Sequence, residues 1–273
     1  MTKKEFFMGI DSDGTAFDSM TLKHRNAFIP KMIEIWGLEK HSEKVFEICE
    51  DINLYSKTRG IDRFSGLLVS FDRMKEEGII LPDYSPLKKF LEENEKLSNA
   101  TLEEYIRVND APILNQVLSW SIEADAVFEE KVEKLMPFKP IVEILKSASE
   151  KADIAVISSA SARSLEKDWQ KEDLSHYLTA IYGQEQGKKG EQLKLATEGR
   201  YEQNKAVMLG DALGDYNAAR SANIRFYPII PGREEQSWLR FEEKYEEIFF
   251  SGRYDENCEK ELMQEFYEAL HMN

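Results

Sequence analysis

Two aspartates near the N-terminus have the spacing of a catalytic acid pair. Asp11 and Asp13 follow the apolar run Phe6–Ile10, and Gly14 and Thr15 come next. One carboxylate of such a pair can attack an electrophile while the other donates and later accepts a proton. The alternative is structural, because an Asp-rich turn also caps the helix that follows it.

A second acidic pair follows another apolar run. Asp211 comes after Ala206–Leu209 and Gly210, and Asp215 lies four residues beyond Asp211. Together with Asp11, these carboxylates form an oxygen-rich group that suits Mg²⁺, which prefers carboxylates, waters and phosphate oxygens. Asp215 has an alternative role as the cap of the helix that it opens.

A hydroxyl and an ammonium group that could hold phosphate lie between these two acidic pairs. Ser158 follows the apolar run 152–157, and Lys188 and Lys189 follow a shorter run. Both kinds of group donate to phosphate oxygens, and the ammonium offsets the repulsion between phosphate and carboxylates. We prefer Ser158 to Ser159, since one of the two would cap the next helix, and Lys188 and Lys189 are both candidates for the ammonium group.

These residues need a parallel sheet to bring them together. Short apolar runs alternate with helical patterns after Pro137, which predicts βαβ units and an α/β fold, a Rossmann-like parallel sheet with helices on both faces. The expected strands are residues 6–10, 152–157, 179–182, 206–209 and 226–230. Because parallel strands end at one edge of the sheet, residues remote in the sequence converge there.

A long helical segment separates the first expected strand from the others. An isolated buried strand does not open an all-helical protein, so we predict an all-helical cap, residues 16–135, inserted into a catalytic core of residues 1–15 and 136–232. We predict a helical C-terminal extension, residues 233–273, packed on the core. The cap helices are expected at 23–36, 42–55, 64–77, 86–97, 101–109, 111–124 and 126–134.

The composition narrows the function. The 36 basic and 51 acidic residues give a net charge of −15, which argues against nucleic acid or an anionic membrane as the main partner. No stretch approaches the roughly 20 apolar residues of a membrane helix. Cys49 and Cys258 show no metal-ligand spacing, so we predict reduced thiols and a cytoplasmic protein. The phosphate-binding Gly-x-x-x-x-Gly-Lys-Ser/Thr loop of many ATPases is absent.

The motifs and their order resemble the haloacid dehalogenase-like superfamily. Four features of this sequence look like that superfamily's four motifs, in the same order. They are Asp-x-Asp-Gly-Thr after a strand, a strand followed by Ser, a later Lys, and Gly-Asp-x-x-x-Asp after a strand. The helical insertion between the first and second motifs resembles that superfamily's cap. With Asp at position 13, the first motif is similar to that of the superfamily's phosphatase and phosphomutase branch. Dehalogenases of the superfamily look like Asp-x-Tyr at this motif, and phosphonate hydrolases look like Asp-x-Ala.

The resemblance implies a role for each side chain. Asp11 would be the nucleophile and Asp13 the general acid and base, with a backbone carbonyl that also meets the metal. The ligands implied for Mg²⁺ are Asp11, Asp13, Asp211 and Asp215, and those for phosphate are Ser158 and Lys189 (or Lys188). The third motif departs from the Lys-Pro of many relatives, and Lys189 fits its shorter form because Leu193 then lies four residues on.

We therefore expect a Mg²⁺-dependent enzyme that hydrolyses a small phosphorylated metabolite, a phosphate monoester, through an aspartyl-phosphate. The alternatives are a phosphomutase resembling β-phosphoglucomutase and a non-catalytic binding member of the superfamily. Lys57, Arg59 and Arg63 form a basic turn in the cap and are candidates for substrate recognition, with a solvated turn as the alternative. Cap closure would exclude water from the reaction.

Overall fold

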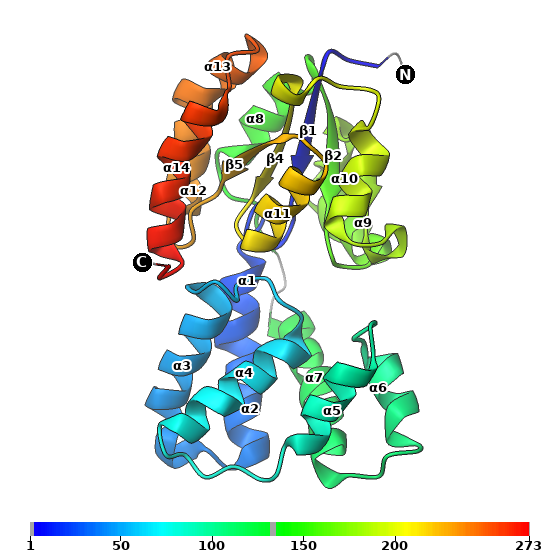
Figure 1. Ribbon diagram of the computed structural model, residues 1–273, viewed down its shortest axis with the longest axis vertical. Coiled ribbons are helices and arrows are strands. Elements are labelled where there is room, and N and C mark those ends of the chain that lie inside the picture. The colour runs from blue at the N-terminus through cyan, green and yellow to red at the C-terminus, as the bar shows by residue number, and fades with distance from the viewer. Residues whose placement is uncertain (1–2, 132–134, 273) are drawn as a thin grey trace. The chain divides into compact units, whose positions relative to one another are not determined.

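The computed structural model describes residues 3–131 and 135–272 of the chain. The chain divides into two compact units (Figure 1). The first, called here the α/β unit, comprises Met1–Ser19 and Leu135–Asn273, and the second, the helical unit, is Met20–Lys134.

Among the described residues, the α/β unit contains a sheet of five parallel strands. They are β1 (Phe6–Ile10), β2 (Ala152–Ile157), β3 (Ala180–Tyr182), β4 (Ala206–Gly210) and β5 (Arg225–Pro228). Their order in the sheet is β3-β2-β1-β4-β5. β1 is central and fully buried, which explains its unbroken apolar sequence. The predicted fold class, a Rossmann-like parallel sheet, is confirmed.

The strand order reverses beside β1, and this reversal sends helices to both faces. The described helices between the strands are α8 (Ile141–Ala148), α9 (Ala162–Lys171), α10 (Lys189–Thr197) and α11 (Leu213–Ser221). Right-handed crossovers place α8 and α9 on one face and α10 and α11 on the other; in Figure 1, α10 and α11 lie in front of the strands. The carboxyl ends of β1 and β4 flank this reversal, where open α/β sheets bind their ligands.

The C-terminal segment contributes to both layers of the α/β unit. It contains α12 (Glu234–Arg240), a π-helical turn (Phe241–Tyr245), α13 (Glu246–Phe250) and α14 (Glu256–Ala269). Phe266 of α14 is buried in the apolar cluster formed with Phe7 and with side chains of α10 and α11. Phe249 of α13 packs on Phe6, whose side chain points to the opposite face from that of Phe7. Aromatic side chains of this segment therefore extend the core on both sides of the sheet.

Helices make up the helical unit. They are α1 (Ser19–Lys23), a π-helical turn (His24–Phe28), α2 (Ile29–Trp36), α3 (Ser42–Leu54), α4 (Arg63–Glu76), α5 (Ser85–Glu93), α6 (Asn99–Ile106) and α7 (Pro112–Lys131). Their apolar stripes bury a core of their own, which includes Met32, Phe64, Phe71 and Trp120. A short 3₁₀ turn at Glu39–His41 also belongs to this unit. The described part of the α/β unit contains further 3₁₀ turns at Ser175–Tyr177, Gln184–Gln186 and Gln203–Lys205.

The structure differs from the sequence expectations at several boundaries. The predicted helices 111–124 and 126–134 are one helix, α7, because no Gly or Pro interrupts them; residues 132–134 lie outside the described part. The compact units divide at residues 19/20 and 134/135, whereas the predicted boundaries were 15/16 and 135/136. Phe17 explains the first difference, since its buried ring packs edge-on against Trp169 of the α/β unit.

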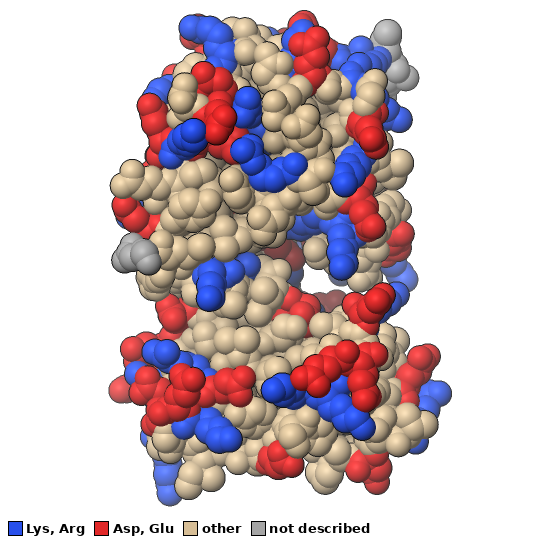
Figure 2. All heavy atoms as spheres, in the orientation of Figure 1, with Lys and Arg blue, Asp and Glu red and all other residues tan. Residues whose placement is uncertain are grey.

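The surface carries both signs of charge despite the net charge of −15. On the face drawn in Figure 2, Lys and Arg side chains lie among Asp and Glu side chains over both units. Among the described residues, none of the helices combines the length and apolar character that a membrane span requires.

We expect Phe249→Ala to lower the free energy of unfolding of the α/β unit by about 3–5 kcal/mol, because truncating a buried Phe leaves a cavity. Phe249 is fully buried, with its ring centroid 5.3 Å from that of Phe6. Phe250 contacts the same ring at 5.2 Å but is only half-buried, so Phe250→Ala is the matched control and should cost less. Chemical denaturation would measure both losses, and two equally small losses would contradict the role given to the C-terminal segment.

Candidate active site

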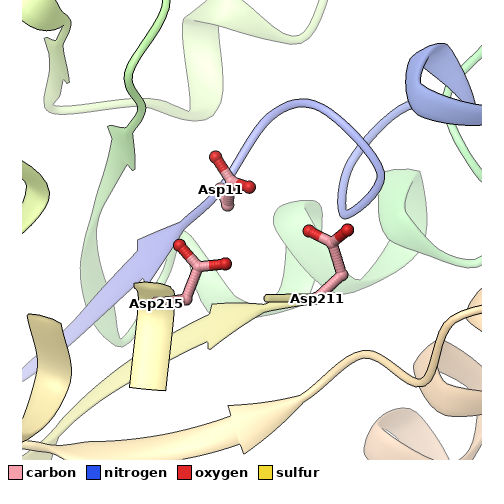
Figure 3. Close-up of side chains that lie close together, drawn as sticks. All are labelled: Asp11, Asp211 and Asp215. Carbon is pink, nitrogen blue, oxygen red and sulfur yellow. The ribbon is translucent and has the colours of Figure 1, made fainter. Parts of the chain in front are cut away.

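Three aspartates converge at the carboxyl edge of the sheet (Figure 3). Asp11 follows β1, Asp211 follows β4, and Asp215 lies in the first turn of α11. One carboxylate oxygen of each residue lies within 4.8 Å of the others, and all three side chains are buried. Three of the four predicted metal ligands therefore form one cluster, and Asp13 is the fourth.

The backbone around β4 fixes these positions. The Asp11 N–H donates to the carbonyl of Leu209 (3.0 Å), which extends the pairing of β1 with β4 by one residue. The Asp215 carboxylate accepts the N–H of Ala212 (3.1 Å), so this residue caps α11 as well as joining the cluster. A Cβ at Gly210 would lie 2.4 Å from the Cβ of Asp215, and only glycine leaves room for that carboxylate.

Lys189 connects two of the carboxylates. Its Nζ lies 2.9 Å from Oδ1 of Asp11 and 2.6 Å from Oδ1 of Asp215. Lys188 is exposed, and its backbone N–H donates to the Glu191 carboxylate (2.8 Å) in the first turn of α10. Of the two candidate lysines, Lys189 is the one whose ammonium lies in the cluster.

The electrostatics of the cluster suit a divalent cation. Burial raises the pKa of the Asp11 carboxyl well above its usual value; Lys189 opposes this, and the charges of Asp215 and Asp211 add to it. Burial likewise raises the pKa of Asp215. Burial disfavours the charged form of Lys189, but Asp11 and Asp215 outweigh it and raise the lysine pKa. Three carboxylates against one ammonium leave two negative charges in excess, which a divalent ion would neutralise.

Asp13 lies beside the cluster on a tight turn. Gly14 has a φ of +79°, a conformation that favours glycine, and its N–H donates to the carbonyl of Phe17 (2.8 Å). This turn leaves Asp13 half-buried, and its carboxylate accepts a hydrogen bond from the Ser19 hydroxyl. The Asp13 side chain is thus held by Ser19, six residues later in the sequence, and remains partly accessible to solvent.

Ser158 follows β2, the neighbour of β1. Val156 is the register partner of Ile10, so Ser158 lies at the same edge of the sheet as Asp11. Its hydroxyl accepts the N–H of Ala160 (3.2 Å), whereas the side chain of Ser159 is exposed. Neither serine caps α9, which begins at Ala162 with Ser161 as its N-cap, so the expectation that one of the two would cap this helix is wrong.

Two buried polar residues of the site carried no role in the sequence analysis. The Thr15 hydroxyl donates to Oδ1 of Asp211 (2.7 Å). Thr15 belongs to the first motif, which could have signalled this role. Gln192 lies on α10, and its amide nitrogen lies 2.8–2.9 Å from the carbonyls of Ser158, Gly183 and Gly187. Nothing in the local sequence distinguishes Gln192 from an ordinary surface residue of a helix, because its partners come from two loops, those after β2 and β3.

The basic turn of the helical unit is divided between the surface and the interior. Lys57 is exposed. Arg59 is buried and donates to the carbonyl of Leu54 (2.8 Å). Arg63 forms an ion pair with Asp125 (2.6 Å). The guanidinium groups of Arg59 and Arg63 therefore stabilise the helical unit itself, and the alternative of a fully solvated turn does not describe them.

Solved structures similar to this chain include several hydrolases and a mutase. A putative β-phosphoglucomutase from Thermotoga maritima is 20% identical with a TM-score of 0.49, over 82% of this chain and 85% of that one. A putative phosphoglycolate phosphatase from Lactobacillus plantarum is 10% identical with a TM-score of 0.44, over 86% and 91%. A haloacid dehalogenase-like family hydrolase from Streptococcus pneumoniae is 16% identical with a TM-score of 0.42, over 87% and 90%.

Comparison with protein families identifies the chain. No curated protein matches the sequence. The model of one family, haloacid dehalogenase-like hydrolase, matches residues 68–229, which include Ser158, Lys189, Asp211 and Asp215. Since this match covers more than half of the chain, the protein belongs to the haloacid dehalogenase-like hydrolases.

Proposed function

We propose that this protein is a Mg²⁺-dependent phosphatase that hydrolyses a small phosphate monoester through an aspartyl-phosphate on Asp11. One observation carries the proposal: the Lys189 ammonium lies 2.9 Å from Asp11 and 2.6 Å from Asp215, inside a buried group of three carboxylates. A nucleophilic carboxylate needs such positive charge nearby, because its target, a phosphate ester, is itself an anion.

The carboxylates supply the ligands for the metal. Mg²⁺, when bound by Asp11, Asp211, Asp215 and the main-chain carbonyl of Asp13, would offset the negative charge that phosphate brings to the site. The excess negative charge and the raised pKa of Asp11 and Asp215 support this assignment, because both would be relieved by a cation.

The proposed reaction uses the two aspartates of the first motif in turn. Asp11 attacks phosphorus and forms a P–O bond to its carboxylate, while the bond from phosphorus to the alcohol oxygen breaks. Protonated Asp13 gives its proton to that oxygen, and the alcohol leaves. Asp13 then takes a proton from a water that attacks the phospho-Asp11, which releases inorganic phosphate and restores the Asp11 carboxylate. Lys189 and the Ser158 hydroxyl hold the phosphate oxygens during both steps.

The first prediction is that the purified protein with Mg²⁺ releases phosphate from members of a panel of small phosphorylated metabolites, and that Asp11→Asn abolishes this release. A malachite-green assay would measure it. Asp153→Asn is the matched control, because Asp153 is the second residue of β2, near the amino end of the strand, and accepts a hydrogen bond from the Tyr201 hydroxyl there (2.5 Å). Retained turnover in Asp11→Asn, or turnover that requires a bisphosphate primer as in a mutase, would contradict the proposal.

Loss of turnover in Asp11→Asn should not reflect unfolding. Replacing Asp11 removes a like charge from the buried cluster while Asp215 continues to pair with Lys189. The metal-free variant should therefore unfold at a midpoint equal to or above that of the wild-type protein. A clearly lower midpoint in scanning calorimetry would mean that the site contributes to stability as well as to chemistry.

Metal removal gives a second prediction. Mg²⁺ should raise the unfolding midpoint of EDTA-dialysed protein, because a ligand that binds only the folded state adds about 2.7 kcal/mol at 100 times its Kd. Asp211→Asn should lose most of this shift, although the Thr15 hydroxyl can still donate to the new amide oxygen. Sodium chloride at equal ionic strength is the control, and an equal Mg²⁺ shift in the variant would exclude Asp211 as a ligand.

Asp13 provides a third prediction. Asp13→Asn should slow release of the alcohol by about 10²–10⁴, the usual cost of losing a general acid. The loss should shrink for aryl phosphates, whose leaving groups depart without a proton, and burst kinetics across a leaving-group series would measure it. The same loss for every leaving group would show that Asp13 does not act as the acid.

A further inference from the structure

The C-terminal segment reaches the loop that carries the proposed catalytic aspartates. Trp238 of α12 donates its indole N–H to the carbonyl of Thr15 (2.8 Å). The Thr15 hydroxyl in turn donates to Oδ1 of Asp211 (2.7 Å). The side chains of Trp238 and Thr15 have no exposed surface, so these two hydrogen bonds are shielded from competing water.

The start of α12 is itself fixed to the sheet. The Ser237 hydroxyl accepts the N–H of Ile230 (3.0 Å), just beyond β5, and donates to the carbonyl of Arg233 (2.9 Å). The buried Tyr227 of β5 donates its hydroxyl to the carbonyl of Ser237 (2.8 Å). Hydrogen bonds of its neighbour Ser237 therefore fix the backbone that carries Trp238, whose indole contacts Thr15.

We propose that Trp238 is a positioning residue for the metal site, which acts through Thr15 to orient the Asp211 carboxylate. The inference rests on the proposed function, in which Asp211 is a ligand of a divalent cation. The indole fixes the backbone of Thr15, and the hydroxyl of Thr15 then holds one oxygen of Asp211. Hydrogen bonds from such outer partners orient metal ligands and commonly change metal affinity by about 10- to 100-fold.

A second tryptophan serves as an internal comparison. Trp169 of α9 donates its indole N–H to the Ser12 hydroxyl (3.1 Å) in the same loop, and it too has no exposed surface. Its acceptor is a side chain rather than the backbone of Thr15. Both indoles are therefore buried and hydrogen-bonded to the same loop, whereas the connection through Thr15 to Asp211 belongs to Trp238.

The test measures metal binding directly. Isothermal titration of EDTA-dialysed protein with Mn²⁺ would compare the wild type with Trp238→Phe, which keeps the ring and removes the N–H. We expect Trp238→Phe to weaken Mn²⁺ binding by at least about threefold, the loss of one hydrogen bond. Trp169→Phe, the matched control, should bind Mn²⁺ as the wild type does even if it lowers the unfolding midpoint as much.

Thr15 variants test the same connection without touching the tryptophan. Thr15→Val removes the hydroxyl and should weaken Mn²⁺ binding by about 10- to 100-fold, while Thr15→Ser retains it and should restore most of the affinity. In the Thr15→Val background, Trp238→Phe should cause no further loss of affinity, because the connection to Asp211 is already broken.

Three results would overturn the inference: unchanged Mn²⁺ affinity in Trp238→Phe, an equal loss in Trp169→Phe, or additive losses in the double variant. The proposed function fails by a different result, the absence of phosphate release from the whole metabolite panel. A wild-type protein that binds Mn²⁺ without turnover would thus contradict the phosphatase and still decide, through the same affinities, whether Trp238 positions Asp211.

Discussion

The chemistry of this protein depends on one electrostatic constraint: Asp11, Asp211 and Asp215 share a buried region with the Lys189 ammonium. Burial disfavours the charged form of each carboxylate and is the main reason why the pKa of Asp11 is raised; the like charges of Asp215 and Asp211 add to this cost, and Lys189 opposes it. A protein selected for stability alone would replace such a group by apolar side chains. The surrounding fold is best understood as the framework that holds these charges together.

The framework combines a sheet reversal with hydrogen bonds that cross large distances in the sequence. The reversal beside β1 opens the edge where Asp11 and Asp211 meet. Gln192 ties the loops after β2 and β3 to the helix that carries Lys189, and Thr15 ties the first loop to Asp211. Each carboxylate is thereby oriented by backbone or side-chain partners before any ligand arrives, which reduces the cost of reorganisation during a reaction.

Much of this architecture can be predicted from the sequence. The rest cannot, and there is a physical reason for that. The strands and the acids at their ends follow from local patterns, since an apolar run and the polar residue that ends it are neighbours in the chain, whereas the preference for Lys189 rests on the resemblance to the superfamily's third motif. The hydrogen bond from Trp238 to Thr15 joins residues more than 200 positions apart, and no local pattern predicts it. The burial of Arg59, a candidate for substrate recognition, is hidden from the sequence for a related reason: it depends on how helices pack, which residue type alone does not reveal.

The central place of β1 also has a consequence for biosynthesis. Its partners in the sheet are β2 and β4, and the first register pair joins Phe6 to Ala152. At about 5–20 residues per second, a ribosome needs roughly 7–30 s to reach that partner after β1 has been made. The helical unit, Met20–Lys134, is synthesised before β2 and can fold in the interval. During that time β1 is an apolar strand without its partners in the sheet, and such a strand is prone to aggregation.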